Sequence, residues 1–167
     1  MSDLNQDLFQ LAMSDEARPL IAAVQKHIAE SVDPITEEFF RLNDEKTDRW
    51  SWHPRQLELL EGAKNKAKES GLWNFFLPDS EIGSCLTNLD YAYIAVELGK
   101  SPLASESLNC SAPDTGNMEV LERVGTPEQK KKWLEPLLNG EIRSAYAMTE
   151  PDVPSSDCLQ ARASKCP

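Results

Sequence analysis

Apolar residues recur at spacings of three and four along residues 14–139, which is the period of amphipathic helices. Ser14 can cap a first helix, and Pro34 either ends this helix or begins a second one that continues through Phe40. The apolar face of the first helix consists of Leu20, Ile21, Val24 and Ile28. The chain therefore starts as an amphipathic helical pair.

Caps and stops predict further helices. Pro54 suits the first position of a helix, and Gly71 suits the left-handed residue that follows one. Asp114 can cap a helix that stops at Gly125, and another helix runs over about residues 88–98. Thr126 gives the strongest helix start, because proline and then glutamine follow it as in a capping box. The buried side of that last helix consists of Trp133, Leu134, Leu137 and Leu138.

Two segments depart from the helical pattern. Residues 72–78 form a bulky apolar loop, which we interpret as a core plug between helices, with contact to a ligand as the alternative. From Ile142 to Thr149, side chains alternate in a way that suits a strand. A single strand cannot satisfy its own backbone groups, so partner strands are needed. From the residues alone, the prediction is a mainly α chain: a helical bundle over residues 1–140, a segment with an unpartnered strand over 141–157, and a disordered tail over 158–167.

Composition limits the possible functions. The 167 residues include 17 basic and 28 acidic ones, a formal charge of −11, which opposes nonspecific attraction to nucleic acid or anionic lipid. We find neither a signal peptide at the N-terminus nor an apolar run approaching the roughly 18 residues of a membrane span. We therefore expect a soluble cytoplasmic protein without a nucleic-acid partner.

The four cysteines are Cys85, Cys110, Cys158 and Cys166. They form no Cys-x-x-Cys pair and lie far in sequence from the two histidines, so we interpret them as structural thiols in a reducing compartment. A thiol or metal protein that uses them is the competing interpretation, and stoichiometric zinc or iron would support it.

Residues 146–157 form the most informative stretch, Tyr-Ala-Met-Thr-Glu-Pro-Asp-Val-Pro-Ser-Ser-Asp. Together with Asn-Cys-Ser-Ala-Pro-Asp-Thr-Gly-Asn-Met at 109–118 and Gln-Lys-Lys-Lys-Trp-Leu-Glu-Pro-Leu-Leu at 129–138, it follows the order and spacing of one family. Over about residues 14–157 the chain resembles the N-terminal part of an acyl-CoA dehydrogenase, in the group of family members ten and eleven. Pro154 and the tail after Asp157 depart from the family pattern.

The resemblance implies that the helical domain leads into the first strand of a truncated middle β-domain, which starts over residues 141–157. It also implies FAD-dependent α,β-desaturation of acyl-CoA thioesters. Tyr146, Met148 and Thr149 would face the flavin ring, and Ser155 and Ser156 would reach its diphosphate or the acyl-CoA entrance. For Thr149, the alternative is an ordinary hydroxyl at a strand end, bonded to backbone.

For the acyl-CoA, the resemblance suggests contacts from Asn109, Thr115 and Ser156, although residues 109–118 could equally be a plain helix connection capped by Asp114. Lys130, Lys131 and Lys132 are interpreted as a solvated helix face. The resemblance provides no catalytic base for this chain. Glu150 is an acidic candidate for that role, but the resemblance implies that this position shapes a turn.

We therefore expect a partial acyl-CoA dehydrogenase that is inactive alone and binds FAD weakly or not at all. Acyl-CoA as substrate and a homo-oligomer are expected of the full-length family. The alternative is a noncatalytic helical binding or scaffold module.

Overall fold

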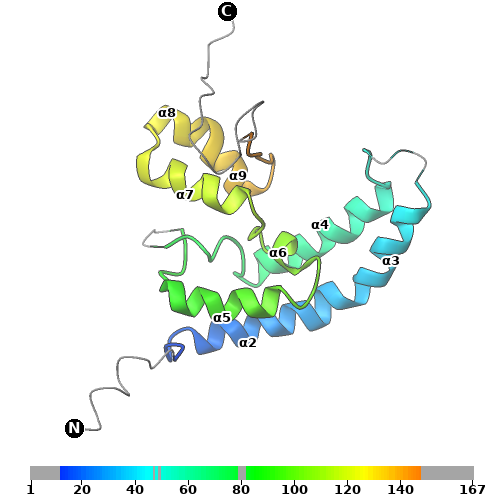
Figure 1. Ribbon diagram of the computed structural model, residues 1–167, viewed down its shortest axis with the longest axis horizontal. Coiled ribbons are helices and arrows are strands. Elements are labelled where there is room, and N and C mark those ends of the chain that lie inside the picture. Colours follow the sequence, from blue (N-terminus) through cyan, green and yellow to red (C-terminus); the bar gives the residue numbers. More distant parts are fainter. Residues whose placement is uncertain (1–11, 47, 49, 79–81, 148–167) are drawn as a thin grey trace, which may run out of the picture.

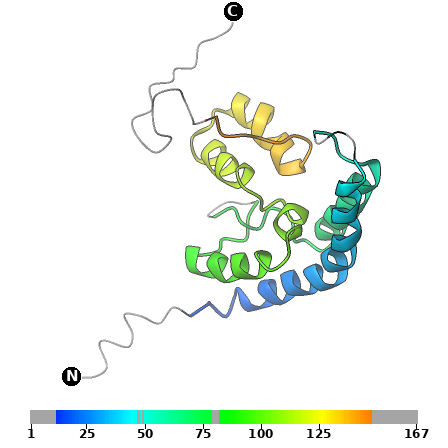
Figure 2. The same ribbon diagram turned by 45° about the vertical axis from the view of Figure 1, so that its right-hand side comes forward.

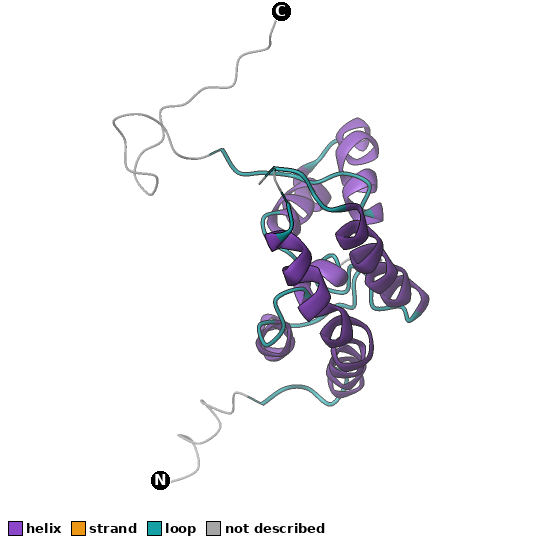
Figure 3. Cartoon of the chain, turned by 90° about the vertical axis from the view of Figure 1, so that its right-hand side faces the viewer, coloured by secondary structure: helices purple, strands orange, loops and turns teal. Residues whose placement is uncertain are grey.

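The computed structural model of the chain describes residues 12–46, 48, 50–78 and 82–147. These residues form helices joined by turns and irregular loops, and no strand is assigned among them (Figure 3). The order of the elements is α2 (Arg18–His27), the π-helical turn η1 (Ile28–Val32), α3 (Asp33–Asp44), α4 (Pro54–Glu69), α5 (Asn88–Leu98), α6 (Ala104–Ser107), α7 (Asp114–Val124), α8 (Pro127–Gln129), the π-helical turn η2 (Lys130–Leu134) and α9 (Glu135–Asn139).

The helices form two groups with a loop between them. α2 and α5 pack side by side, and η1 and α3 continue from α2 into a hairpin with α4 (Figure 1). α7, α8 and α9 gather on the opposite side of the loop that joins α4 to α5, as a second view confirms (Figure 2). The predicted helical bundle is therefore present.

The loop that begins at Leu72 fills the space between the two groups. Phe75 and Leu77 are each only 1% exposed, and they join a core that also includes Val24 of α2 and Met118 of α7. Burying a side chain of this size contributes about 1.5–3 kcal/mol. This confirms the interpretation of residues 72–78 as a core plug.

The helix starts agree with the sequence signals. The Thr126 hydroxyl accepts a hydrogen bond from the Gln129 N–H at 3.3 Å, and the Gln129 side chain accepts one from the Thr126 N–H at 2.9 Å. The predicted capping box is confirmed. Gly71 has a φ of 69°, as expected for a left-handed residue after a helix. The predicted cap Ser14 is different: its hydroxyl accepts a hydrogen bond from the Ala17 N–H in the turn before α2, while Ala17 itself is the N-cap and α2 has no side-chain cap.

Pro34 lies in the first turn of α3, which begins at Asp33, so the alternative of a second helix starting at this proline is confirmed, although the chain stays helical across the boundary. A proline inside a helix cannot donate to the preceding turn, and its ring crowds that turn. Here the helix widens just before it: the Asp33 N–H donates to the Ile28 carbonyl five residues back, which defines η1. η2 has the same relation to Pro136. The ribbon stays helical through both prolines.

Two sequence predictions need correction. The strand predicted over residues 142–149 is not formed by residues 142–147, which are irregular, and residues 148 and 149 lie outside the described part. The Ser144 N–H donates to the side chain of Asp114 instead of to a neighbouring strand. Trp133 was placed on a buried side but is 47% exposed, with the Lys132 ammonium 4.7 Å from its ring centre. The buried side of this helix consists of Leu134, Leu137 and Leu138 without Trp133.

Candidate functional site

A pocket of about 600 Å³ lies between the start of α5, one face of α7 and the loop that precedes α5. α7 contributes Thr115, Glu119 and Arg123, which are four residues apart and so share a helical face. The cap of α5, Thr87, lines the opposite side. Apolar and aromatic surface comes from Phe76, Leu86 and Tyr91. The exposed lining of the pocket is thus mainly polar, with a smaller apolar contribution from these three side chains.

Tyr91 contributes a neutral aromatic ring to the pocket wall. Its burial, followed by the nearby Cys110 and Glu119, raises the pKa of its phenol well above the usual value. Phenolate formation at neutral pH is therefore disfavoured. The ring centre lies 6.3 Å from that of Phe75, so this part of the wall is tied to the core plug.

Asp114, at the start of α7, holds the segment that leaves the bundle. The carboxylate is 2% exposed, and its Oδ1 accepts hydrogen bonds from the N–H and the hydroxyl of Ser144 at 2.7 and 2.5 Å. Its Oδ2 pairs with Nε of Arg143 at 2.7 Å. Asn117 donates to the Ser144 hydroxyl oxygen at 2.7 Å. The prediction that Asp114 caps its own helix is wrong, because no side-chain cap is formed there.

Tyr146 lies beside α7, two residues after Ser144, which is bound by Asp114. A Cβ built on Gly116 would lie 3.7 Å from the Tyr146 hydroxyl, and Tyr146 is 66% exposed. Thr115 and Gly116 are neighbours on α7. The structure therefore brings two predicted site residues, Thr115 in the pocket and Tyr146 beside Gly116, to the same turn of one helix.

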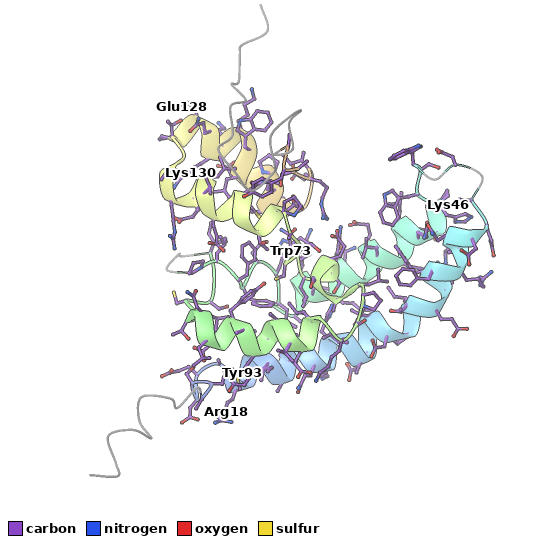
Figure 4. The ribbon with its side chains drawn as sticks, viewed as in Figure 1. Arg18, Lys46, Trp73, Tyr93, Glu128 and Lys130 are labelled. Atoms are coloured by element: carbon purple, nitrogen blue, oxygen red, sulfur yellow. The ribbon has the colours of Figure 1, made fainter. Side chains whose placement is uncertain are left out.

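Asn109 lies in a different environment from Thr115. Its side-chain amide donates to Asn74 at 2.7 Å and to the Leu137 carbonyl at 3.0 Å, and the residue is 6% exposed. Asn74 and Trp73 both donate to the Leu138 carbonyl, and Trp73 lies beneath the group of α7 to α9 (Figure 4). In the described residues, the Asn109 amide is thus engaged in holding the end of α9.

The other predicted flavin contacts, Met148, Thr149, Ser155 and Ser156, lie outside the described residues, as does Glu150. The sequence analysis missed the pairing of Arg143 with Asp114. A lone arginine just before an apolar and hydroxyl-rich stretch could have suggested an acidic partner, but nothing in its spacing indicated an acid 29 positions earlier.

Two further features bear on alternative functions. Cys85 is exposed and Cys110 is buried, and burial raises the pKa of the Cys110 thiol far above its usual value. The part of the chain that the structure describes has no cluster of three or more His, Cys, Asp or Glu side chains able to hold a metal ion. Nor is any helix in that part long and apolar enough to cross a membrane.

Comparison with known families identifies the domain. The family description "Acyl-CoA dehydrogenase, N-terminal domain" matches residues 14–141, which include all of the described helices. The match spans both helical groups and the pocket between α5 and α7. The chain belongs to the acyl-CoA dehydrogenase family and contains its N-terminal helical domain.

Individual relatives agree with this assignment. The chain is 48% identical over 157 residues to acyl-CoA dehydrogenase family member 10 of Mus musculus, with 91% of this chain and 14% of the relative covered. It is 48% identical over 141 residues to acyl-CoA dehydrogenase family member 11 of Homo sapiens, with 84% and 17% covered. The resemblance to family members ten and eleven is confirmed.

A solved structure has the same fold. The structure of a putative acyl-CoA dehydrogenase from Mycobacterium abscessus superposes with a TM-score of 0.78 at 48% identity. The match covers 87% of this chain and 37% of that protein. The chain thus spans only a minor part of the length of each of these relatives.

Proposed function

We propose that this chain supplies the acyl-binding side and the first flavin contacts of an FAD-dependent acyl-CoA dehydrogenase. The observation that supports this most directly is the placement of the pocket: one face of α7 lines it, and the same helix lies beside Tyr146. Both features lie in a domain of the acyl-CoA dehydrogenase family. The α,β-desaturation of an acyl-CoA thioester is the proposed reaction.

The pocket suits an acyl thioester chemically. Phe76, Leu86 and Tyr91 offer apolar surface to a hydrocarbon chain, and the Thr115 hydroxyl can donate to a carbonyl. Of the two proposed substrate contacts that the structure describes, Thr115 lines the pocket and Asn109 does not. Asn109 would act only indirectly, by fixing the end of α9, and Ser156 stays a prediction.

The residues from Tyr146 onward would hold FAD, which supplies the hydride acceptor for the reaction when bound. Tyr146 fits this role, because its largely exposed ring offers an aromatic face to a planar ligand. Met148 and Thr149 would contact the flavin ring, while Ser155 and Ser156 would contact the diphosphate or the acyl-CoA entrance. We propose residues 141–157 as the start of the family's β-domain.

This chain by itself is proposed to neither hold FAD tightly nor oxidise acyl-CoA. One helical wall leaves most of a flavin in water, so the cost of ordering the segment after Tyr146 is not offset. None of its carboxylates is assigned as the base. Homo-oligomer formation and a cytoplasmic location belong to the same proposal.

The test joins this chain, through Asp157, to the continuation of the Mycobacterium abscessus relative. We expect the 167-residue chain to be colourless after gel filtration, and the joined protein to be yellow and bleached by acyl-CoA. In the joined protein, Thr149→Ala should weaken flavin binding or slow reduction more than the control Lys131→Ala on the exposed face of η2. If acyl-CoA bleaches flavin bound to the 167-residue chain itself, the proposal is refuted, and Glu150 becomes the first candidate for the catalytic base.

A second function, a noncatalytic binding or scaffold module, is favoured by one feature. The tip of the α3–α4 hairpin exposes Phe40, Trp50 and Trp52 by 45%, 82% and 53%, around a pocket of about 340 Å³ that Lys46 also lines (Figure 4). Exposed aromatic clusters often mark interaction sites. A joined protein that folds but takes up no flavin would favour this second function.

A further inference from the structure

Four charged side chains form an alternating chain that joins α4, α6, α7 and the segment after α9. Lys64 of α4 pairs with Glu106 of α6 at 3.1 Å between Nζ and Oε1. Glu106 pairs in turn with Arg143, and Arg143 pairs through Nε with Asp114 of α7 at 2.7 Å. The segment that leads to Tyr146 is thus tied to three helices by charge.

Asp114 is the most buried member of this chain. Its side chain is 2% exposed, compared with 10% for Lys64, 20% for Glu106 and 47% for Arg143. A buried carboxylate without partners is strongly unfavourable, so this group needs its hydrogen-bond donors. Arg143 and Ser144 belong to residues 141–147, which follow α9 and which we call the exit segment. These two residues supply three donors to the Asp114 carboxylate: Nε of Arg143, and the N–H and hydroxyl of Ser144.

The contacts of Asp114 with Arg143 and Ser144 lie close in sequence to the proposed flavin contacts. Ser144 is two residues before Tyr146 and five before Thr149. On α7, Asp114 is two residues before Gly116, which the Tyr146 hydroxyl approaches. A shift of Ser144 along α7 would therefore carry Tyr146 with it.

We propose that Asp114 is a positioning residue, whose carboxylate fixes Arg143 and Ser144 and thereby sets the place where the flavin-contacting residues from Tyr146 onward begin. The flavin part of this inference rests on the proposed function. The placement of Tyr146 by Asp114 does not depend on it.

Asp90 provides a matched control. Its carboxylate is also buried, at 4% exposure, in the first turn of a helix, and it accepts from the Ser14 N–H at 2.8 Å and the Thr87 hydroxyl at 2.7 Å. It ties down a distant segment as Asp114 does, but that segment is the one before α2. Removing either carboxylate should destabilise the fold, and only one should affect Tyr146.

The first experiment uses the 167-residue chain labelled with fluorotyrosine, with the Tyr146 signal assigned through Tyr146→Phe. We expect Asp114→Ala to move the Tyr146 fluorine resonance toward that of the free amino acid, while Asp90→Ala leaves it in place. Arg143→Ala, a change at a half-exposed side chain, should have the same effect as Asp114→Ala if the latter fails to fold. Arg143→Lys should restore part of the native shift. An unmoved Tyr146 signal, or an equal shift in Asp90→Ala, would overturn the inference.

The second experiment uses the joined protein and measures the flavin. Arg143→Ala and Asp114→Asn should shift the flavin absorption band and lower kcat at least tenfold with a smaller change in KM, since the chemical step depends on placement. Glu58→Gln, on the exposed Arg55 pair of α4, is the control that should change neither. An unchanged kcat in both Arg143→Ala and Asp114→Asn would refute the inference that Asp114 sets the position of the flavin-contacting residues. If the joined protein with native Asp114 binds no flavin, both the proposed function and the effect of Asp114 on the flavin site are refuted. The fluorine experiment would still decide whether Asp114 positions Tyr146.

Discussion

At the scale of single residues, two polar side chains perform tasks other than those that the sequence suggested. Asn109, which the family resemblance suggested as a substrate contact, donates to Asn74 and to the end of α9. Asp114 was expected to cap α7 and instead binds the exit segment. In both residues the partner is about 30 positions away, so local sequence could identify a polar group but not its task.

His27 gives a pH-dependent prediction. Its Nε2 lies 3.1 Å from the Ser107 hydroxyl, which itself donates to the Ala104 carbonyl, so Nε2 must be the donor. Burial, and then the charge of Lys66, lower the pKa of His27. The unfolded chain therefore binds this proton first as the pH falls below about 6.5.

We expect the free energy of unfolding attributable to His27 to be constant above pH 7 and to fall below about pH 6.5 until the lowered pKa is reached. For one proton, the slope cannot exceed about 1.4 kcal/mol per pH unit. Urea unfolding at a series of pH values checks this, with His27→Gln as the control that should flatten the dependence. A slope that is the same in His27→Gln would assign the effect to other groups.

At the scale of the element, caps and prolines explain where helices begin, bend and end. The Thr126 capping box and the left-handed Gly71 were visible in the sequence, because both depend on neighbouring residues. The π-helical turn before Pro34 was not predicted, although it follows from the missing N–H and the bulk of proline. The packing on both sides of Pro34 keeps the helix continuous.

Two glycine substitutions should have opposite effects. Gly62 lies on the exposed side of α4 and an added Cβ meets nothing within 4 Å, so Gly62→Ala should stabilise the chain by about 0.5–1 kcal/mol. Gly140 has a φ of 74°, and an added Cβ would lie 3.0 Å from the Trp73 ring, so Gly140→Ala should destabilise it by about 1–2 kcal/mol or more. Urea midpoints at constant slope would measure both, and a stabilised Gly140→Ala would contradict the left-handed end of α9.

At the scale of the whole molecule, the described core is divided. One cluster joins α2, α5, α7, α9 and the 72–77 loop, and a second cluster fills the α3–α4 hairpin with Phe39, Leu42, Leu59 and Leu60. The tip of the hairpin extends away from the remaining helices, while the other end of α4 packs against α6 (Figure 1). Separate clusters of this kind can open separately.

We predict that Leu42→Ala, which leaves a cavity in the hairpin cluster and costs about 2–5 kcal/mol, accelerates amide hydrogen exchange in α3 and the start of α4 more than in α9. Leu137→Ala in the other cluster should have the opposite pattern. Native-state exchange resolved by residue measures both. Uniform acceleration by either substitution would mean that the two clusters form one cooperative unit.

The sequence alone determined the helices, most of their boundaries, the buried 72–77 loop and the family, since periodicity, caps and short motifs are local properties of the chain. The alternation over residues 142–149 also predicted a strand, and this prediction is wrong for residues 142–147. In this segment Ser144 is bound by the side chains of Asp114 and Asn117. Only the tertiary structure decided that Thr115 lines a pocket, that Tyr146 lies beside Gly116, and that Lys64, Glu106, Arg143 and Asp114 form one chain of charges. These relations join residues that lie up to 79 positions apart, and they arise only when burial of the shared core brings the helices together.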